Sequence, residues 1–309
     1  KLDNITLTKV DRETAAIVPD KVVVTLTKSG MIKRTSIASF KTKRKKMAKS
    51  DDDIVIDTIR TNTVDSLMIF TNKGVMYRLS VNDIPDGDKP TSVHSLVKIA
   101  SDEYPEVIYS IYKDTDAKYV LFITKNGLVK KTALDEFVKT KRKTGIATIN
   151  LREGDSLASV SLIKEEPLIL VTKNGMVIKF ASTEIAATGR ATAGVKGIDL
   201  KKDDYVVAGL PLRNVTDNLA LFTSEGYGKQ MEQNELVTQK RAGIGIVGYK
   251  ATESSGYIVG AALITTGDNL LLVKNVKSVC VKSEDIPILK RIAAGNLLAK
   301  GGIQSVSKI

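Results

Sequence analysis

The stretch that decides the fold reads Leu168-Ile169-Leu170-Val171-Thr172-Lys173-Asn174-Gly175-Met176-Val177-Ile178-Lys179. Two short apolar runs flank an Asn-Gly pair, and both residues of that pair tolerate a positive φ. The flanking runs are rich in branched apolar side chains, which favour strands. The stretch therefore predicts a tight β-hairpin.

The same pattern recurs along the chain, which indicates a repeat fold. Further copies occupy residues 22–34, 67–78, 120–131 and 219–229, and the turn glycines are Gly30, Gly74, Gly127, Gly175 and Gly226. Ten residues after each glycine lies an apolar residue: Phe40, Ile84, Phe137, Ile185 and Leu236. A sixth copy at 270–276 has Val276 instead of the glycine, so we expect a different turn there, because valine disfavours a positive φ.

Each repeat spans 44 to 53 residues and holds about four strand-like stretches, which is typical of a propeller. We therefore predict an all-β fold, a six-bladed propeller-like disc that forms a single domain over residues 1–309. The approximate blades are 21–62, 63–114, 115–163, 164–212, 213–264 and 265–309, with residues 1–20 joining the last blade. Pairing of the strand-like ends, 5–10 and 302–306, would close the ring and remove exposed edges, and an open spiral is equally compatible with the sequence.

The amino-acid composition excludes several kinds of function. The chain has 47 lysines and arginines against 35 acidic residues, a net charge of +12, which favours a polyanionic partner. One cysteine, Cys280, excludes an internal disulfide and a Cys-based zinc site, and the single His94 disfavours His-based catalysis, so we expect no metal site. The longest apolar run, 119–123, is too short to span a membrane, and no signal peptide opens the chain. Because the chain does not begin with Met, we interpret it as a fragment of a longer cytoplasmic protein.

Basic loops follow the hairpins at one phase of the repeat. Equivalent positions of a radial repeat lie on one circle, so these bases predict a positive band that suits the phosphates of a bent duplex. Only 15 aromatic residues are present, which weighs against a stacking platform for single strands. No paired carboxylates, phosphate loop or nucleophile–base pair stands out, so we predict no catalytic residue. The predicted DNA contacts are Lys33, Arg34, Lys41, Lys43, Arg44, Lys45, Lys46, Arg78, Lys130, Lys131, Lys139, Lys141, Arg142, Lys143, Lys179, Arg190, Lys196, Lys229, Lys240, Arg241, Lys290 and Arg291.

Other roles for these bases stay open. Charged loops can be solvated turns, and a propeller with a basic surface can bind a protein instead of DNA. The arginines of the loops have a further structural alternative, in which neighbouring backbone carbonyls hold the guanidinium: Arg142, Arg190, Arg241 and Arg291.

On these residues the chain resembles the C-terminal domain of the A subunit of bacterial type IIA topoisomerases, a family that comprises gyrase and topoisomerase IV. The resemblance rests on the Thr-x-x-Gly hairpins, on the loop that begins Phe40-Lys41-Thr42-Lys43-Arg44 and on residues 188–196. It covers essentially the whole chain. It implies a six-bladed β-pinwheel, a propeller whose neighbouring blades exchange strands, which binds and bends double-stranded DNA around its basic rim.

One motif separates the two members of the family. The first blade of gyrase carries a heptad of Gln, two bases, Gly-Gly, a base and Gly, and gyrase wraps DNA for negative supercoiling. Topoisomerase IV bends DNA more weakly and is directed to decatenation and relaxation. Here residues 42–48 read Thr-Lys-Arg-Lys-Lys-Met-Ala, and the nearest match, 239–245 in the fifth blade, has Ala242 for a glycine and Ile244 for a base. The resemblance therefore favours topoisomerase IV.

The resemblance also implies what lies outside this chain. In the family the catalytic tyrosine belongs to the N-terminal breakage-reunion region, and ATP and Mg²⁺ act through the B subunit. The chain is thus expected to be a non-catalytic part of an ATP-dependent topoisomerase and to hold no cofactor itself. Its expected partners are double-stranded DNA, the B subunit of an A2B2 heterotetramer and the breakage-reunion region of its own parent polypeptide, in the bacterial cytoplasm at the nucleoid and without a membrane.

Overall fold

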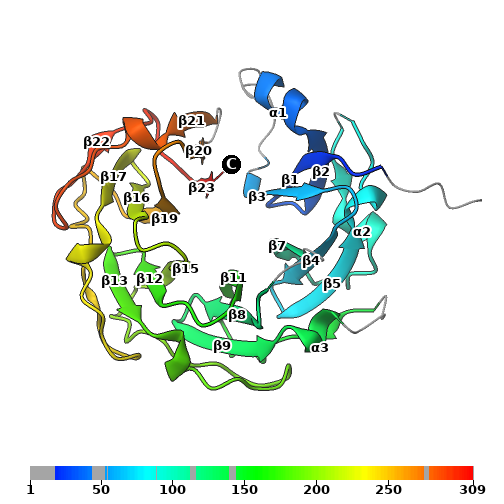
Figure 1. Cartoon of the computed structure of the whole chain (residues 1–309), viewed down its shortest axis with the longest axis horizontal. Helices are drawn as coiled ribbons and strands as arrows, with labels where there is room; N and C mark the ends of the chain where they lie inside the picture. Colours follow the sequence, from blue (N-terminus) through cyan, green and yellow to red (C-terminus); the bar gives the residue numbers. More distant parts are fainter. Residues whose placement is uncertain are drawn as a thin grey trace, which may run out of the picture.

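In the computed structural model the chain forms a ring of six antiparallel β-sheets around a central axis (Figure 1). The structure describes residues 18–43, 53, 55–87, 89–111, 116–138, 144–274 and 278–308. The predicted all-β, six-bladed fold is confirmed. The helical elements of the described residues are short: α1 (Ile37–Lys43), α2 (Val93–Leu96), α3 (Asp135–Val138) and the 3-10 turns η1 (Val81–Asp83), η2 (Ser182–Glu184), η3 (Gln233–Glu235) and η4 (Ser283–Asp285).

The hairpin of each repeat supplies two neighbouring strands of one sheet. From the axis outward the first three sheets are β3 (Val55–Asn62), β1 (Lys21–Thr27), β2 (Met31–Ser36), β6 (Thr91–Ser92); β7 (Pro105–Ile111), β4 (Ser66–Thr71), β5 (Val75–Ser80), β10 (Ile146–Ala147); and β11 (Leu157–Ile163), β8 (Tyr119–Thr124), β9 (Leu128–Ala133), β14 (Val195–Lys196). The other three are β15 (Val206–Pro211), β12 (Leu168–Thr172), β13 (Met176–Phe180), β18 (Ile246–Val247); β19 (Ile258–Ile264), β16 (Asn218–Thr223), β17 (Tyr227–Met231), β22 (Asn296–Leu297); and β23 (Ser305–Lys308), β20 (Asn269–Val273), β21 (Val279–Lys282). The first strand of each series lines a cavity of about 730 Å³ along the axis, so the last strand lies at the rim.

The rim strand of each of the first five sheets comes from the following repeat, so neighbouring blades exchange strands. Beside each exchanged strand, the carbonyl oxygen of the hairpin glycine accepts a backbone N–H from that following repeat. The five bonds are Val93 N to Gly30 O (2.9 Å), Thr148 N to Gly74 O (2.9 Å), Gly197 N to Gly127 O (2.7 Å), Gly248 N to Gly175 O (2.8 Å) and Leu298 N to Gly226 O (2.9 Å). The glycines that mark the repeat in the sequence are therefore the points where one repeat is fastened to the next.

Two constraints keep these turn positions as glycine. Gly175 has φ of +82° and Gly226 has φ of +93°, in the left-handed region that other residues rarely adopt. The arriving chain also leaves no room, because a Cβ on Gly175 would lie 2.1 Å from the carbonyl oxygen of Tyr249. A Cβ on Gly226 would lie 1.9 Å from the carbonyl oxygen of Ala299.

Apolar side chains from both sides fill the joints between neighbouring sheets. Among the described residues, five joints each contain a cluster of ten to twelve buried apolar residues. The apolar residues ten positions after the turns are all buried in these joints or at the seam: Phe40, Ile84, Phe137, Ile185, Leu236 and Ile286. Because each sheet is covered on both faces, its middle strands are near-continuous apolar runs.

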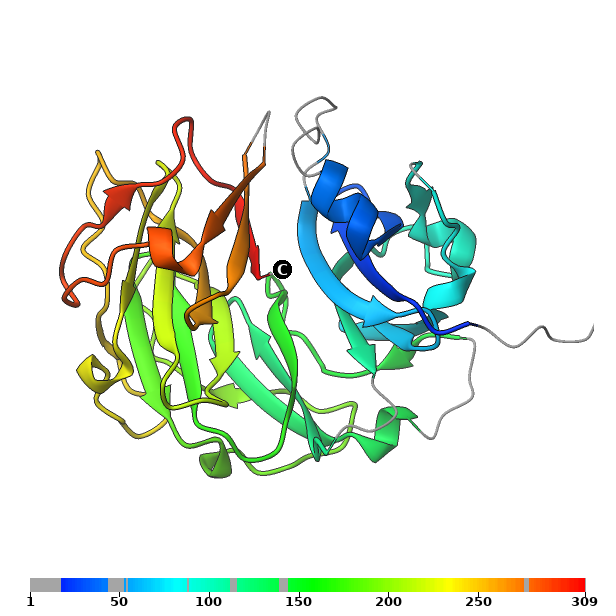
Figure 2. The same ribbon diagram turned by 45° about the horizontal axis from the view of Figure 1, so that its top comes forward.

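The ring closes at a seam between the sixth and first sheets, which face each other in Figure 2. Val23 and Phe40 pack there against Leu271 and Val273, and Ser305 Oγ donates a hydrogen bond to the carbonyl oxygen of Val55 (2.7 Å). The C-terminal strand β23 pairs with β20 of its own sheet, where it forms the strand next to the axis. The predicted partner at residues 5–10 lies outside the described residues, so the closure that the structure shows is side-chain packing.

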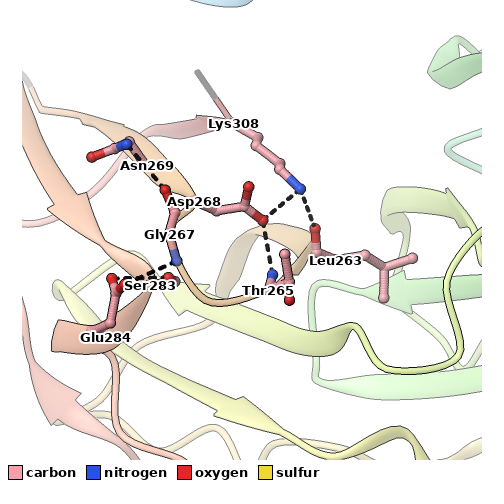
Figure 3. A network of polar contacts seen from close by, with 8 residues as sticks. All are labelled: Leu263, Thr265, Gly267, Asp268, Asn269, Ser283, Glu284 and Lys308. Atoms are coloured by element: carbon pink, nitrogen blue, oxygen red, sulfur yellow. Dashed lines mark hydrogen bonds and ion pairs between the residues drawn. The ribbon is translucent and has the colours of Figure 1, made fainter.

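A polar network fastens β23 at the axis (Figure 3). Lys308 Nζ lies 2.6 Å from Asp268 Oδ2 and 3.3 Å from the carbonyl oxygen of Leu263, which belongs to β19. Asp268 Oδ2 also accepts the N–H of Thr265 (2.8 Å), which shapes the turn between β19 and β20. In the same turn Glu284 Oε1 accepts the N–H of Gly267 (2.9 Å). The network thus ties the last strand to the fifth sheet as well as the sixth.

Because the hairpin glycines join one repeat to the next, Gly175→Ala should lower the stability of the fold. The substitution imposes left-handed strain of about 1–3 kcal/mol and forces the arriving Tyr249 carbonyl away. We expect the free energy of unfolding to fall by more than about 3 kcal/mol in denaturant titrations. Gly154→Ala is the matched control, because Gly154 has φ of +73° and open space around its Cβ position. Equal losses in the two variants would show that the contact between repeats contributes nothing.

Candidate nucleic-acid interface

The segments that lead into the exchanged strands form the outer edge of the ring. We call residues 188–196, 238–247 and 289–297 the rim segments. Each begins with a backbone N–H donated to the preceding hairpin: Thr188 N to Lys131 O (3.0 Å), Gln239 N to Lys179 O (2.7 Å) and Leu289 N to Gln230 O (2.9 Å). The repeat therefore places equivalent residues of the three segments at the same level of the rim.

Exposed lysines occur in all three rim segments. Lys196 and Lys240 are exposed, and the side chain of Lys290 is 87% exposed. Lys196 Nζ lies 2.8 Å from Asp199 Oδ1, and Lys290 Nζ lies 3.0 Å from Glu235 Oε1. Exposed ion pairs of this kind are worth about 0–1 kcal/mol, so phosphates can compete for these lysines.

Carboxylates of the preceding repeat fix the arginines of the rim segments. Glu184 Oε2 accepts the backbone N–H of Arg241 (2.9 Å), and Glu235 Oε2 accepts the backbone N–H of Arg291 (2.8 Å). In the fourth repeat Arg190 Nε lies 3.7 Å from Glu136 Oε2. Lys290 together with the Arg291 N–H holds the pKa of the Glu235 carboxyl below its usual range.

The guanidinium groups of Arg241 and Arg291 bind backbone carbonyls of the exchanged strands. Arg241 Nη1 donates to the carbonyl oxygen of Lys196, and Arg291 Nη1 donates to that of Val247 (2.6 Å). The sequence left open that backbone carbonyls hold the guanidinium groups of the loop arginines, and the structure shows this arrangement for Arg241 and Arg291. Each guanidinium group thus joins its own rim segment to the preceding one.

The structure corrects the sequence prediction at three lysines. Lys130, Lys131 and Lys229 are buried, so they do not lie on a surface that DNA can reach. Lys130 Nζ donates to the carbonyl oxygen of Thr148 (2.9 Å), and Lys131 Nζ donates to that of Ser182 (3.1 Å). Lys229 Nζ donates to the carbonyl oxygens of Lys290 (3.0 Å) and Arg291. Lys229 therefore supports a rim segment from beneath.

Burial changes the titration of these lysines. It lowers the pKa of Lys130 and of Lys229 to about 8, and it lowers the pKa of Lys131. The ammonium of Lys131 lies 4.7 Å from the ring centre of Tyr119, and that of Lys229 lies 5.4 Å from the ring centre of Tyr249. Carbonyl oxygens and aromatic faces thus replace part of the lost hydration.

The other predicted bases occupy several environments. Arg78 is exposed, and its Nη1 donates to the carbonyl oxygen of Val138 (3.3 Å). Lys33, Arg34 and Lys179 are half-buried, and Arg34 Nη1 is 3.3 Å from Asn82 Oδ1. The side chains of Lys41 and Lys43, and the following predicted bases altogether, lie outside the described residues: Arg44, Lys45, Lys46, Lys139, Lys141, Arg142 and Lys143.

Sequence reasoning missed the carboxylates of this site. Glu136, Glu184 and Glu235 each directly precede the apolar residue that lies ten positions after the turn. That recurrence at one phase of the repeat was a readable signal. Within the described part of the chain no three His, Cys, Asp or Glu side chains come together as a metal site. No helix among the described residues is both long enough and apolar enough to cross a membrane.

The fold and its rim define a strand-exchanging β-propeller with a lysine-bearing edge. The chain belongs to the family described as the DNA gyrase C-terminal domain, beta-propeller, whose model matches residues 21–62, 65–89, 118–164, 166–213 and 217–265.

Individual relatives come from both branches of that family. The A subunit of DNA gyrase from Lawsonia intracellularis is 33% identical over 292 residues, which cover 91% of this chain and 35% of the relative. The A subunit of DNA topoisomerase 4 from Bacillus subtilis is 33% identical over 236 residues, which cover 75% of this chain and 29% of the relative. The chain therefore spans about a third of the length of these curated relatives.

Two solved structures share the fold over nearly the whole ring. The structure of a DNA gyrase A C-terminal domain matches with a TM-score of 0.80 and 26% identity, and covers 94% of this chain and 99% of that one. The crystal structure of the C-terminal domain of DNA topoisomerase IV matches with a TM-score of 0.75 and 30% identity, and covers 95% and 94%.

The buried ammonium of Lys229 predicts a pH dependence of stability. Its pKa is about 8 in the folded chain and near 10.5 when unfolded, so the unfolded state binds more protons between these values. The stability of the native chain should therefore rise with pH through this window, by about 1–3 kcal/mol relative to Lys229→Met. Denaturant unfolding at about pH 7 and about pH 10 measures the difference.

The exposed Lys240 provides the control for this experiment. Lys240→Met removes an exposed lysine of the neighbouring rim segment. It should follow the native pH profile. A Lys229→Met profile parallel to the native one would contradict the burial of a charged group at this position.

Proposed function

We propose that this chain is the DNA-binding and DNA-bending module of the A subunit of a type IIA topoisomerase. The observation that carries the proposal is that each of three consecutive rim segments exposes a lysine: Lys240 and Lys290 at one position of the repeat, and Lys196 at the end of its segment. Bases spaced around a curved edge match the phosphates of a bent duplex, and neutralising phosphates supplies most of a sequence-independent affinity. Membership of the gyrase C-terminal domain family supports the same role.

More narrowly, we propose a topoisomerase IV type of module, which bends DNA without strong wrapping and directs decatenation and relaxation. The sequence supports this proposal, since residues 42–48 of the first repeat lack the glycines of the gyrase heptad. In the nearest match to that heptad, Ala242 occupies a glycine position with φ of +67° and Ile244 stands in place of a base. The crystal structure of a topoisomerase IV C-terminal domain, at 30% identity, is in accord.

Gyrase is the second candidate, and specific observations favour it. The Lawsonia relative that covers 91% of this chain is a gyrase, and the gyrase C-terminal structure has the higher TM-score of the two. In that case the module would wrap DNA with one handedness, and the wrap would allow the enzyme to introduce negative supercoils.

The whole enzyme is part of the proposal. We place the catalytic tyrosine in an N-terminal breakage-reunion region of the same polypeptide, and ATP and Mg²⁺ with a B subunit in an A2B2 assembly. The chain itself would hold no cofactor and would work on the nucleoid in the bacterial cytoplasm. The isolated chain should accordingly bind duplex DNA without cleaving it.

Salt dependence of duplex binding tests the module. Each phosphate contact contributes about −0.9 to the slope of log K against log salt, so Lys240→Gln/Lys290→Gln should make the slope shallower by about 1.8. Lys118→Gln/Lys164→Gln is the matched control, since these exposed lysines beside β8 and β11 belong to no rim segment. Fluorescence anisotropy with a labelled duplex over a salt series gives both slopes.

Three outcomes are informative. A shallower slope in the rim variant alone supports the proposed contacts. An unchanged slope in the rim variant would remove these lysines from the interface. Native binding that is absent or independent of salt would overturn the DNA-binding role and favour a propeller that docks proteins.

A further inference from the structure

Exposed apolar side chains accompany the lysines of the rim segments. Ile244 is 58% exposed and Ile292 is 64% exposed, and further exposed apolar residues of the same segments are Val195, Val247 and Leu297. Single exposed apolar residues are ordinary on a protein surface. Each of the three consecutive rim segments carries at least one of them in addition to a lysine, although Ile244 and Ile292 occupy different positions of the repeat, and their presence in every segment calls for a physical reason.

Hydrogen bonds to backbone carbonyls join the rim segments that carry these residues. Arg291 Nη1 donates to the carbonyl oxygen of Val247, so the segment that carries Ile292 contacts the exchanged strand β18 through its arginine. One repeat earlier, the N–H of Ala242 donates to Gly197 O (2.9 Å) and the N–H of Asp199 donates to Gly243 O (2.9 Å). These bonds hold the loop that carries Ile244 at the end of β14. The segments that carry the exposed apolar residues, which we call the apolar strip, therefore contact one another at two consecutive joints.

The loop before Ile244 is strained. Ala242 has φ of +67°, and Asp203 is the only other non-glycine residue of the described chain with a positive φ. Such a conformation costs about 1–3 kcal/mol, and strain of this kind is typically retained at functional sites. Gly245 follows with φ of +73°, and a Cβ there would lie 2.6 Å from the carbonyl oxygen of Val177. The loop is thus held tightly against the sheet on both sides of Ile244, whose side chain is exposed to solvent.

The arginines beside these isoleucines already have other partners, so they are not free to enter a groove of DNA. Arginine is the usual side chain that enters a minor groove, but the guanidinium groups of Arg241 and Arg291 bind the carbonyl oxygens of Lys196 and Val247. The lysines of the segments suit phosphates. An isoleucine has no favourable contact with a phosphate. A duplex offers apolar surface at the thymine methyl groups of the major groove and at the base stack in the minor groove, and proteins that bend DNA insert apolar wedges into the latter.

We propose that Ile244 and Ile292 are apolar wedges that enter the minor groove of duplex DNA and bend it at successive contacts with the rim. The inference rests on the DNA-binding function proposed above and assigns to these residues a contact with bases. Partial unstacking is easiest at pyrimidine–purine steps, so such steps should gather where the two isoleucines meet the duplex.

Bending measured by energy transfer tests the wedges. The full chain and its Ile244→Ala/Ile292→Ala variant are bound to a duplex labelled at both ends, under salt at which both are saturated. A wedge contributes a kink of about 20° or more, so the bend should decrease by at least that angle in the variant. The salt slope should stay unchanged, since no phosphate contact is lost. Val215→Ala is the control, because Val215 is 83% exposed and lies outside the rim segments.

A second readout reports directly on the bases. A duplex that carries 2-aminopurine at a pyrimidine–purine step should brighten when the native chain unstacks that step, and it should brighten less with the variant. Equal bending of DNA and equal 2-aminopurine brightening by the two proteins would contradict the wedge proposal. The apolar strip would then have no binding role or would bind a protein. A shallower salt slope in the variant would also contradict the wedge proposal, since the isoleucines would then act by placing the lysines. If the native chain itself does not bind the duplex, the DNA-binding function fails instead.

Discussion

A backbone hydrogen bond to the carbonyl oxygen of a hairpin glycine joins each of the first five repeats to the next. All five glycines have a positive φ, and at Gly175 and Gly226 the close approach of the next repeat also leaves no room for a Cβ. No single repeat can form this hydrogen bond, because the donor always belongs to the following repeat. Closing the bond places the exchanged strand at the rim, and with it the lysines, isoleucines and arginine–carboxylate contacts of the rim segments. The candidate interface is thus a consequence of how the ring is assembled.

The same radial packing decides which bases reach solvent. Neighbouring sheets cover each sheet of the ring on both faces. The side chains of a middle strand alternate between these two faces, so neither set of side chains forms a solvent-exposed face. The bases that follow the hairpin glycine at Lys130, Lys131 and Lys229 consequently lie in the interior, where carbonyl oxygens hold their ammonium groups. The exchanged segments, by contrast, carry bases that reach solvent, such as Lys240 and Lys290, and Arg78 is a base of a middle strand that also does so.

Much of the fold could be predicted from the sequence, because the repeat is short-range. Asn174-Gly175 specifies a hairpin locally, and five copies of that signal with a buried apolar residue ten positions later define the blades. The strand exchange involves pairing between repeats, such as Met176 with Val247, which periodicity does not reveal. Only the family resemblance predicts this strand exchange.

The candidate site was harder to predict from the sequence than the fold. A lysine carries no sign of whether packing will cover it, so the sequence predicts a DNA contact at Lys229, whose side chain the structure shows to be buried. The carboxylates Glu184 and Glu235 had a readable position in the repeat, but their role depends on an N–H contributed by the next repeat.

We propose that the rim bends duplex DNA without wrapping it into a strong chiral turn. The decisive experiment is to seal nicked circular DNA with the chain bound, remove the protein and read the linking number, with a mobility shift in parallel to confirm binding. A rim that bends without wrapping gives a clear mobility shift with little change in linking number. A large, concentration-dependent change of one sign would contradict this proposal and identify a gyrase-type wrap.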